Sequence, residues 1–232
     1  MGRLFGHDRD GRHWFRFGRI FEAGHSLRKR IFFSRSTGGV SISMRFEPRK
    51  IVITEDENSL WYPLRTVPRH EIKLYRQLEE KGIPVYLPVM PAVKVHHVCY
   101  KTNSYRYEDE VLRPMLPSYV FARLDCTQRQ SVWRTNSVRA LLDVPKVQQA
   151  SFAEELRGLQ VMEELSFHTK VEYKKEIAVN DRFVIEEPRQ FEGSYGYLVE
   201  RRKRFLWVIK LEIIGGCVTA EIDPRQYKFT KV

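Results

Sequence analysis

The spacing of apolar residues in the middle of the chain predicts a domain in which helices pack on a sheet. Residues 60–66 form a short apolar run, and residues 116–124 alternate between two faces, as strands do. Between them, residues 70–81 carry apolar side chains three and four positions apart, and Gly82 follows where a helix end favours a positive φ. We therefore expect a strand, a helix and a strand in this order.

The neighbouring patterns complete an α+β arrangement. Further strands are expected at residues 83–87 and 138–144, a short helix at 128–136, and a projecting hairpin whose tip lies near residues 102–104. Ser151 and Glu154 have the spacing of a helix capping box, and an apolar stripe follows them to Leu165. The predicted order is β-α-β-hairpin-β-α-β-α.

The C-terminal part of the chain has a different pattern. Residues 166–178 are charged and lack a helical stripe, which predicts a linker. Beyond it, short apolar runs alternate with turn residues, as in a small barrel. The predicted fold class is α+β: an antiparallel sheet with helices, followed by a small five-stranded β-barrel.

Positive charge is concentrated at the N-terminus. Of a formal net charge of +11 over 232 residues, the first fifty contribute +8, from twelve Lys or Arg against four Asp or Glu. The basic pI therefore says less about nucleic-acid binding by the folded part than the total implies. We expect residues 1–57 to be a basic, mostly disordered arm; it also resembles a transit peptide, and Met44 as the true start remains an alternative.

Sequence motifs give no support for catalysis, a cofactor or a membrane span. The three cysteines are far apart, which fits a reducing cytoplasm, and no apolar run approaches the roughly 18 residues of a membrane helix. Serine-hydrolase, zinc-protease and phosphate-loop motifs are missing, so we expect no enzyme. His96, His97 and Cys99 invite a metal site, but strand alternation separates His96 from the other two, and no metal is expected.

Several segments together resemble the NusG family. The N-terminal domain of that family is matched by Leu60-Trp61-Tyr62, by residues 78–88, by Met115-Leu116-Pro117-Ser118-Tyr119-Val120-Phe121 and by residues 138–144. The tail resembles a KOW motif at residues 179–185, 191–193 and 196–200. The resemblance covers residues 60–232 and implies an N-terminal domain at 58–165, a linker at 166–178 and a KOW domain at 179–232.

This resemblance implies a monomeric transcription elongation factor that binds bacterial RNA polymerase. In the family, an apolar depression docks on the clamp helices of the β′ subunit, and a loop reaches the β subunit. The matching docking turn is Leu116, Pro117 and Tyr119; Leu141 and Leu156 are expected beside it, and Gln130 and Ser131 near the β-subunit contact. Phe191 matches an exposed aromatic that contacts Rho or a small-subunit ribosomal protein.

Departures from the family pattern favour a specialised paralogue of the RfaH/UpxY type. Leu116 replaces the usual Phe, Ser118 the usual Gly, and Phe191 is separated from Pro188 in the KOW turn. Such paralogues act as antiterminators on particular operons. The sequence leaves open whether the factor suppresses or recruits Rho, and which operon or DNA element it serves.

Clustered cations suggest nucleic-acid contacts. Lys94, Lys101 and Arg106 on the hairpin are candidates for contact with non-template DNA. The basic turn Arg201, Arg202, Lys203 and Arg204 either contacts RNA phosphates or is an ordinary solvated turn, and both interpretations stay open. The alternative function is a ribosome-associated KOW protein that binds RNA and has no polymerase partner.

Overall fold

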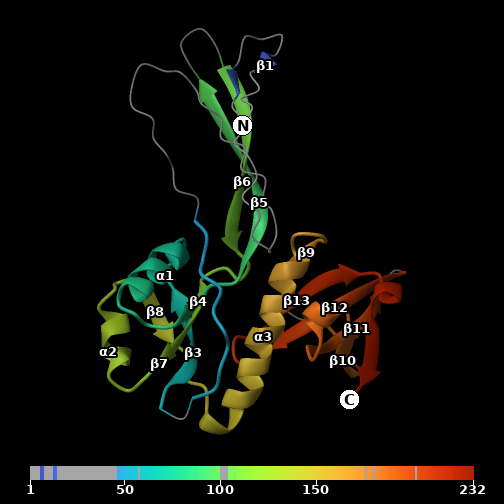
Figure 1. Cartoon of the computed structure of the whole chain (residues 1–232). Helices are drawn as coiled ribbons and strands as arrows, with labels where there is room; N and C mark the ends of the chain where they lie inside the picture. The colour runs from blue at the N-terminus through green and yellow to red at the C-terminus, as the bar shows by residue number, and fades with distance from the viewer. Residues whose placement is uncertain are drawn as a thin grey trace, which may run out of the picture. The chain divides into compact units, whose positions relative to one another are not determined.

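The computed structural model describes residues 46–232 except 57, 100–103, 176, 180 and 202, together with two short N-terminal strands. These strands, β1 (Gly6–His7) and β2 (His13–Trp14), pair with each other. Contacts divide the chain into two units, Met1–Met44 and Arg45–Val232. The elements described below all belong to the second unit (Figure 1).

A four-stranded antiparallel sheet forms the first half of this unit. Its strands, in the order β4-β7-β3-β8, are β4 (Val85–Tyr86), β7 (Tyr119–Leu124), β3 (Leu60–Thr66) and β8 (Val138–Leu141). The predicted alternation of β7 is confirmed, because Phe121 enters one apolar core while Val120 and Ala122 enter another. The sheet therefore buries both of its faces.

Helices cover the two faces separately. The first face packs on α1 (Glu71–Glu80) and α2 (Gln128–Trp133), and the second on α3 (Gln149–Leu165). The predicted helix at 128–136 is shorter than expected, because the chain turns after Trp133 and Asn136 has a φ of 53°. Among the helices that the structure describes, none has both the length and the apolar character needed to cross a membrane.

A long hairpin leaves the sheet between β4 and β7. It consists of β5 (Val89–Cys99) and β6 (Ser104–Pro114), paired in register from Val89↔Pro114 to Cys99↔Ser104 (Figure 1). The predicted tip at residues 102–104 falls mostly outside the described residues.

The C-terminal half is a six-stranded antiparallel sheet. Its order is β14-β10-β11-β12-β13-β9, with β9 (Val171–Lys174), β10 (Arg182–Glu187), β11 (Tyr195–Arg201), β12 (Arg204–Leu211), β13 (Gly216–Ile222) and β14 (Lys228–Lys231). Short 3₁₀ helices, η2 (Arg189–Phe191) and η3 (Pro224–Gln226), connect its strands. In the described part of the chain no pairing joins β14 to β9, so the predicted closed, five-stranded barrel is not seen.

The extra strand, β9, lies inside the predicted linker. Val171 is buried and is paired with Ala220, while Tyr173 is paired with Val218. Lys170, Glu172 and Lys174 make this segment highly charged. The alternation of Val171 and Tyr173 between them was therefore not recognised as a strand. Charge between two apolar positions is compatible with a strand that buries one face.

Part of the predicted arm also belongs to the folded unit. Ile53 is 4% exposed, and the Arg157 Nη1 and Gln160 Nε2 atoms donate to the carbonyl oxygens of Ile53 (3.4 Å) and Ile51 (2.7 Å). Trp61 Nε1 donates to the oxygen of Thr54 at 3.0 Å. Residues 46–56 thus pack on the folded unit instead of continuing a disordered arm: Phe46 and Arg49 contact Tyr75 of α1, and Ile51 and Ile53 lie against α3.

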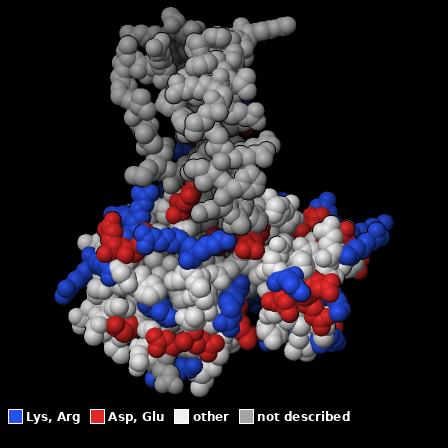
Figure 2. Space-filling view, viewed as in Figure 1, with Lys and Arg blue, Asp and Glu red and all other residues white. Residues whose placement is uncertain are grey.

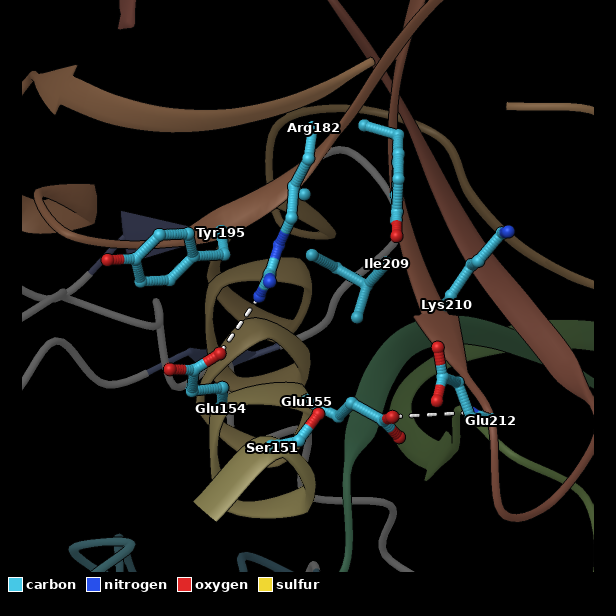
Figure 3. Close-up of a pocket in the computed structure, with 10 residues that line it drawn as sticks. Ser151, Glu154, Glu155, Arg182, Tyr195, Ile209, Lys210 and Glu212 are labelled. Atoms are coloured by element: carbon cyan, nitrogen blue, oxygen red, sulfur yellow. Dashed lines mark hydrogen bonds and ion pairs between the residues drawn. The ribbon is translucent and has the colours of Figure 1, made fainter. Parts of the chain in front are cut away.

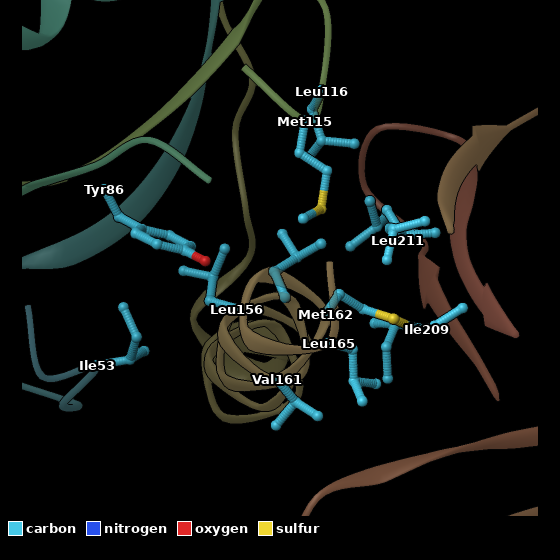
Figure 4. Packing of buried hydrophobic residues seen from close by; sticks show 14 of the residues in the cluster. Ile53, Tyr86, Met115, Leu116, Leu156, Val161, Met162, Leu165, Ile209 and Leu211 are labelled. Carbon is cyan, nitrogen blue, oxygen red and sulfur yellow. The ribbon is translucent and has the colours of Figure 1, made fainter. Parts of the chain in front are cut away.

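Helix α3 is shared by the two sheets. Figure 4 looks along it, with Ile53 and Tyr86 on one side and Ile209 and Leu211 on the other. On the second side the helix approaches β12 closely, since a Cβ built on Gly158 would lie 2.9 Å from the Cδ1 atom of Ile209. The helix is therefore buried around most of its circumference.

The start of α3 differs from the predicted capping box. The 3₁₀ helix η1 (Lys146–Gln148) leads directly into α3 at Gln149, two residues before Ser151. The Gln149 amide behaves like a backbone unit: its Oε1 accepts from Trp61 N at 3.0 Å, and its Nε2 donates to the oxygens of Trp61 (3.1 Å) and Val144 (3.3 Å). A buried side-chain amide with these bonds anchors the helix to β3.

Candidate functional site

Hydrogen bonds to both the N–H and the C=O group of Ser118 hold the turn between β6 and β7 in place. Ser118 has a φ of 64°, its N–H donates to Glu71 Oε1 at 2.7 Å, and its oxygen accepts from Thr66 N at 2.8 Å. Glu71 is buried in the first turn of α1, where a carboxylate is favoured by the helix dipole. The positive φ accounts for the preference for Gly at this position in the NusG-like pattern.

The residues of this turn differ in their exposure to solvent. Leu116 is 0% exposed and lies in the same core as α3, whereas Pro117 is exposed and Tyr119 is half-buried. The sequence placed all three in one docking turn, and the structure keeps them adjacent. Only Pro117 and Tyr119, however, offer side-chain surface to a partner, while Leu116 supports them from beneath.

A groove of about 500 Å³ lies beside the turn. One wall comes from the turn and the base of the hairpin, and the other from the segment that follows α3 and from β9. The lining residues are Met90, Pro91, Arg113, Pro114, Met115, Pro117, Ser166, Thr169, Lys170, Val171, Glu172 and Tyr173. Burial, followed by the nearby Tyr119, raises the pKa of Tyr173. Tyr173 lines the groove, and Tyr119 lies near Tyr173 without lining the groove itself.

The other predicted docking residues fall on both faces of the four-stranded sheet. Leu156 belongs to α3 and is buried in the core that this helix forms, whereas Leu141 is paired with Leu64 and packs on the opposite core. The structure therefore does not bring Leu141 and Leu156 together. Gln130 is exposed on α2, on the same face as Leu141, and the Ser131 oxygen accepts from Lys81 Nζ at 2.9 Å.

The hairpin cations have acidic neighbours. Lys94 and Arg106 are exposed, but Arg106 Nη2 lies 3.0 Å from Glu108 Oε1 and Lys94 is paired in register with Asp109. Lys101 lies outside the described residues. Figure 2 likewise shows Lys and Arg interspersed with Asp and Glu over the viewed face, so no extended surface of one sign is seen there.

Only part of the positive charge in the basic turn between β11 and β12 is paired with an acidic side chain. Arg201, Lys203 and Arg204 are exposed, and Lys203 has a φ of 63°. Arg204 Nη1 lies 2.9 Å from Glu221 Oε2. Arg202 lies outside the described residues. Both interpretations of this turn therefore stay open.

Phe191 is buried, in contrast to the expected exposed aromatic. It is 3% exposed and stacks on Tyr227, with 6.2 Å between ring centroids. Tyr227 stacks in turn on Phe229, which stacks on Trp207. The aromatic residues of the C-terminal tail supply the stack that covers Phe191, and the local turn pattern gave no sign of them.

A polar contact between α3 and the six-stranded sheet was not expected from the sequence (Figure 3). Arg182 Nη2 on β10 lies 2.9 Å from Glu154 Oε2, and Glu212 N donates to Glu155 Oε1 at 3.3 Å. Burial raises the pKa of Glu155 to about 8, and its Oε2 atom has no hydrogen-bond partner among the described residues. The residues lie far apart in sequence, so spacing alone could not reveal them.

The fold and the turn together form an α+β domain that presents a fixed, tyrosine-containing turn beside a groove. Residues 59–156 match the NusG family model, whose description is transcription termination factor nusG. The match covers less than half of the chain and shows that this segment is similar to the NusG family. It ends within α3, before the segment that resembles a KOW motif. A search of curated proteins finds no match to the chain.

Proposed function

We propose that this protein is a transcription elongation factor that binds RNA polymerase and promotes processive elongation or antitermination on particular operons. The observation that carries the proposal is the match of residues 59–156 to the NusG family. In this proposal the protein acts as a monomer in the bacterial cytoplasm, binds its partners without a cofactor and catalyses no reaction.

The exposed part of the docking turn supports the choice of interface. Pro117 and Tyr119 are held by the bonds of Ser118 to Glu71 and Thr66, so little conformational entropy is lost when a partner binds. A half-buried tyrosine combines an apolar ring with a hydroxyl, a combination enriched at interface hot spots. We assign this turn to the β′ clamp helices.

The two faces of the sheet support a bridging role. Tyr119 lies at the α3 face, whereas Gln130 and Ser131 lie on α2 at the opposite face. One rigid sheet can therefore present separate contacts to two polymerase subunits. In the proposal Gln130 and Ser131 contact the β subunit, and Lys94 and Arg106 lie toward non-template DNA.

In the proposal the C-terminal sheet is a second binding module. A contact of Phe191 with Rho or a ribosomal protein requires its side chain to leave the stack on Tyr227. The Leu116 and Ser118 departures support a specialised rather than a general factor.

Replacement of Tyr119 tests the docking turn. We expect Tyr119→Ala to weaken binding to core RNA polymerase by about 2 kcal/mol, or roughly thirtyfold in Kd, as for a hot-spot residue. Binding is measured by fluorescence anisotropy of the labelled full chain. Tyr195→Ala is the matched control, because Tyr195 is an exposed tyrosine on β11 that lies outside the groove.

Binding of the wild-type chain to core polymerase or to ribosomes tests whether the protein is a polymerase-binding factor. Capture by ribosomes without capture by core polymerase would favour the alternative RNA-binding protein. Equal losses for Tyr119→Ala and Tyr195→Ala would retain a polymerase partner but move the interface away from the turn. Transcription through a terminator, with templates from candidate operons, then measures whether the bound factor promotes read-through.

A further inference from the structure

Strand β9 leaves one of its edges unpaired. It is the end strand of the six-stranded sheet, and among the strands that the structure describes it pairs only with β13. The Glu221 N–H donates to the Lys170 oxygen at 3.4 Å, in register with the β9–β13 ladder. Because opposed residues of antiparallel strands alternate between bonded and non-bonded pairs, the backbone groups of Val171 and Tyr173 point away from β13.

This free edge borders the 500 Å³ groove beside the docking turn. The groove is lined by residues 169–173 and by no residue of β13, so it lies on the unpaired side of β9. Its volume falls within the roughly 300–1,000 Å³ of ordinary ligand sites. The donors and acceptors of Val171 and Tyr173 are therefore available to a molecule in the groove.

The opposite wall cannot supply a strand to pair with β9. It contains Pro91, Pro114 and Pro117, and proline has no backbone N–H to donate. A single extended segment inserted between the two walls would satisfy the edge of β9 without competing with a native pairing. Such strand addition is a common mode of peptide recognition.

Charge in the groove indicates the chemistry of that segment. Arg113 is exposed and forms no ion pair with any residue that the structure describes, whereas Lys170 and Lys174 are both paired with Glu172. The remaining lining includes the apolar side chains of Met90, Met115 and Val171. An acidic residue flanked by apolar ones complements this surface.

We propose that the groove binds an extended peptide segment with an acidic side chain, which adds as a strand to the free edge of β9. The acidic side chain pairs with Arg113, and the backbone pairs with Val171 and Tyr173. This inference goes beyond polymerase binding and does not depend on it, because its test uses no polymerase.

The test uses isotope-labelled full chain and a blocked heptapeptide of alternating Glu and Val. We expect amide shifts and slowed hydrogen exchange at Val171 and Tyr173. The same peptide with N-methyl groups on one edge loses its donors there, and we expect it to bind at least about tenfold more weakly. Equal binding of both peptides, or protection confined to the edges formed by β8 or β14, would overturn the proposal.

A charge variant tests the acidic preference. Arg113→Glu should weaken the Glu-Val peptide about threefold to tenfold and strengthen a Lys-Val peptide, since exposed charge pairs contribute modestly. Arg139→Glu is the control, because Arg139 is exposed on β8 and does not line the groove. Identical effects of the two variants would contradict the assignment of Arg113. Shifts at Val171 and Tyr173 with a single-stranded oligothymidine, but not with the peptide, would make the groove a nucleic-acid site instead.

Discussion

The two sides of α3 hold their sheets by different chemistry. Toward the four-stranded sheet, the polar groups have partners: Gln149 makes three hydrogen bonds, and Glu163 accepts from the Tyr86 hydroxyl (3.2 Å) and from Val89 N (3.4 Å). Toward the six-stranded sheet, Glu155 accepts one bond and keeps an unpartnered buried oxygen. Both oxygens of Glu163 and the whole amide of Gln149 thus have partners, whereas one buried oxygen of Glu155 has none among the described residues, and burial raises the pKa of both carboxyl groups.

The largest expected effect comes from the apolar side of the first contact. Phe152 is buried, and its ring lies 5.9 Å from that of Phe121. We expect Phe152→Ala to lower the free energy of unfolding by about 3–5 kcal/mol through lost burial and a cavity. Urea unfolding followed by tryptophan fluorescence measures this cost.

Ile209→Ala provides the comparison on the second side. Ile209 packs against Gly158, and its removal should cost about 2–3 kcal/mol, because less buried surface is lost than with a phenylalanine. A greater cost for Ile209→Ala than for Phe152→Ala would reverse the comparison and make the six-stranded sheet the stronger partner of α3.

Replacing Glu155 by Gln should stabilise the protein at alkaline pH. The pKa of Glu155 is raised from 4.5 to about 8, so its ionisation favours the unfolded chain, and stability falls as pH rises from about 4.5 to about 8. Glu155→Gln removes this loss. At pH 9 we expect a gain on the order of a few kcal/mol, since each pKa unit corresponds to about 1.4 kcal/mol, and almost no gain at pH 4.

Glu163 supplies the internal control for this pH dependence. Burial raises its pKa to about 7, but the bonds from Tyr86 and Val89 stabilise the charged form. Glu163→Gln should therefore give a smaller gain, complete near pH 7. Thermal unfolding of both variants from pH 4 to pH 9 measures the two profiles; a flat profile for the Glu155→Gln difference would contradict its assignment.

The smallest expected effect concerns the ion pair at the rim of the second contact. Arg182 and Glu154 remain partly exposed to solvent, where ion pairs contribute about 0.2–1 kcal/mol. Glu154→Gln should lower stability by no more than this amount. The loss should disappear at 1 M salt, because screening already removes the attraction. A loss that persists at high salt would show that Glu154 acts by packing.

Local patterns predicted the elements whose alternation is uninterrupted. The predicted strand at residues 60–66 is β3, and the predicted helix at 70–81 contains α1. Elements stabilised by distant partners were missed. β9 depends on β13 for its pairing, and residues 46–56 depend on Gln160 and Arg157, which lie more than 100 positions away. The local spacing of apolar residues cannot reveal partners that lie so far away in the sequence.

The candidate site shows the same limit at the level of single residues. The sequence placed Tyr119 and Pro117 on a common turn, and both have accessible surface there. It could not show that Leu116 is covered by the core of α3, or that Phe191 is covered by Tyr227. Exposure is set by whatever packs on a residue in three dimensions, whereas a motif records only its neighbours in the chain.

The amide of Gln149 has a consequence for self-association. Strand β3 pairs with β8 only from Leu64 onward, so its backbone at Trp61 would otherwise be an open template for another copy. The side chain of Gln149 occupies both the donor and the acceptor of Trp61. One glutamine side chain thus prevents another copy from pairing with β3 at Trp61. Its replacement would leave this backbone N–H and C=O free for intermolecular pairing and would also remove the bonds that attach α3 to β3.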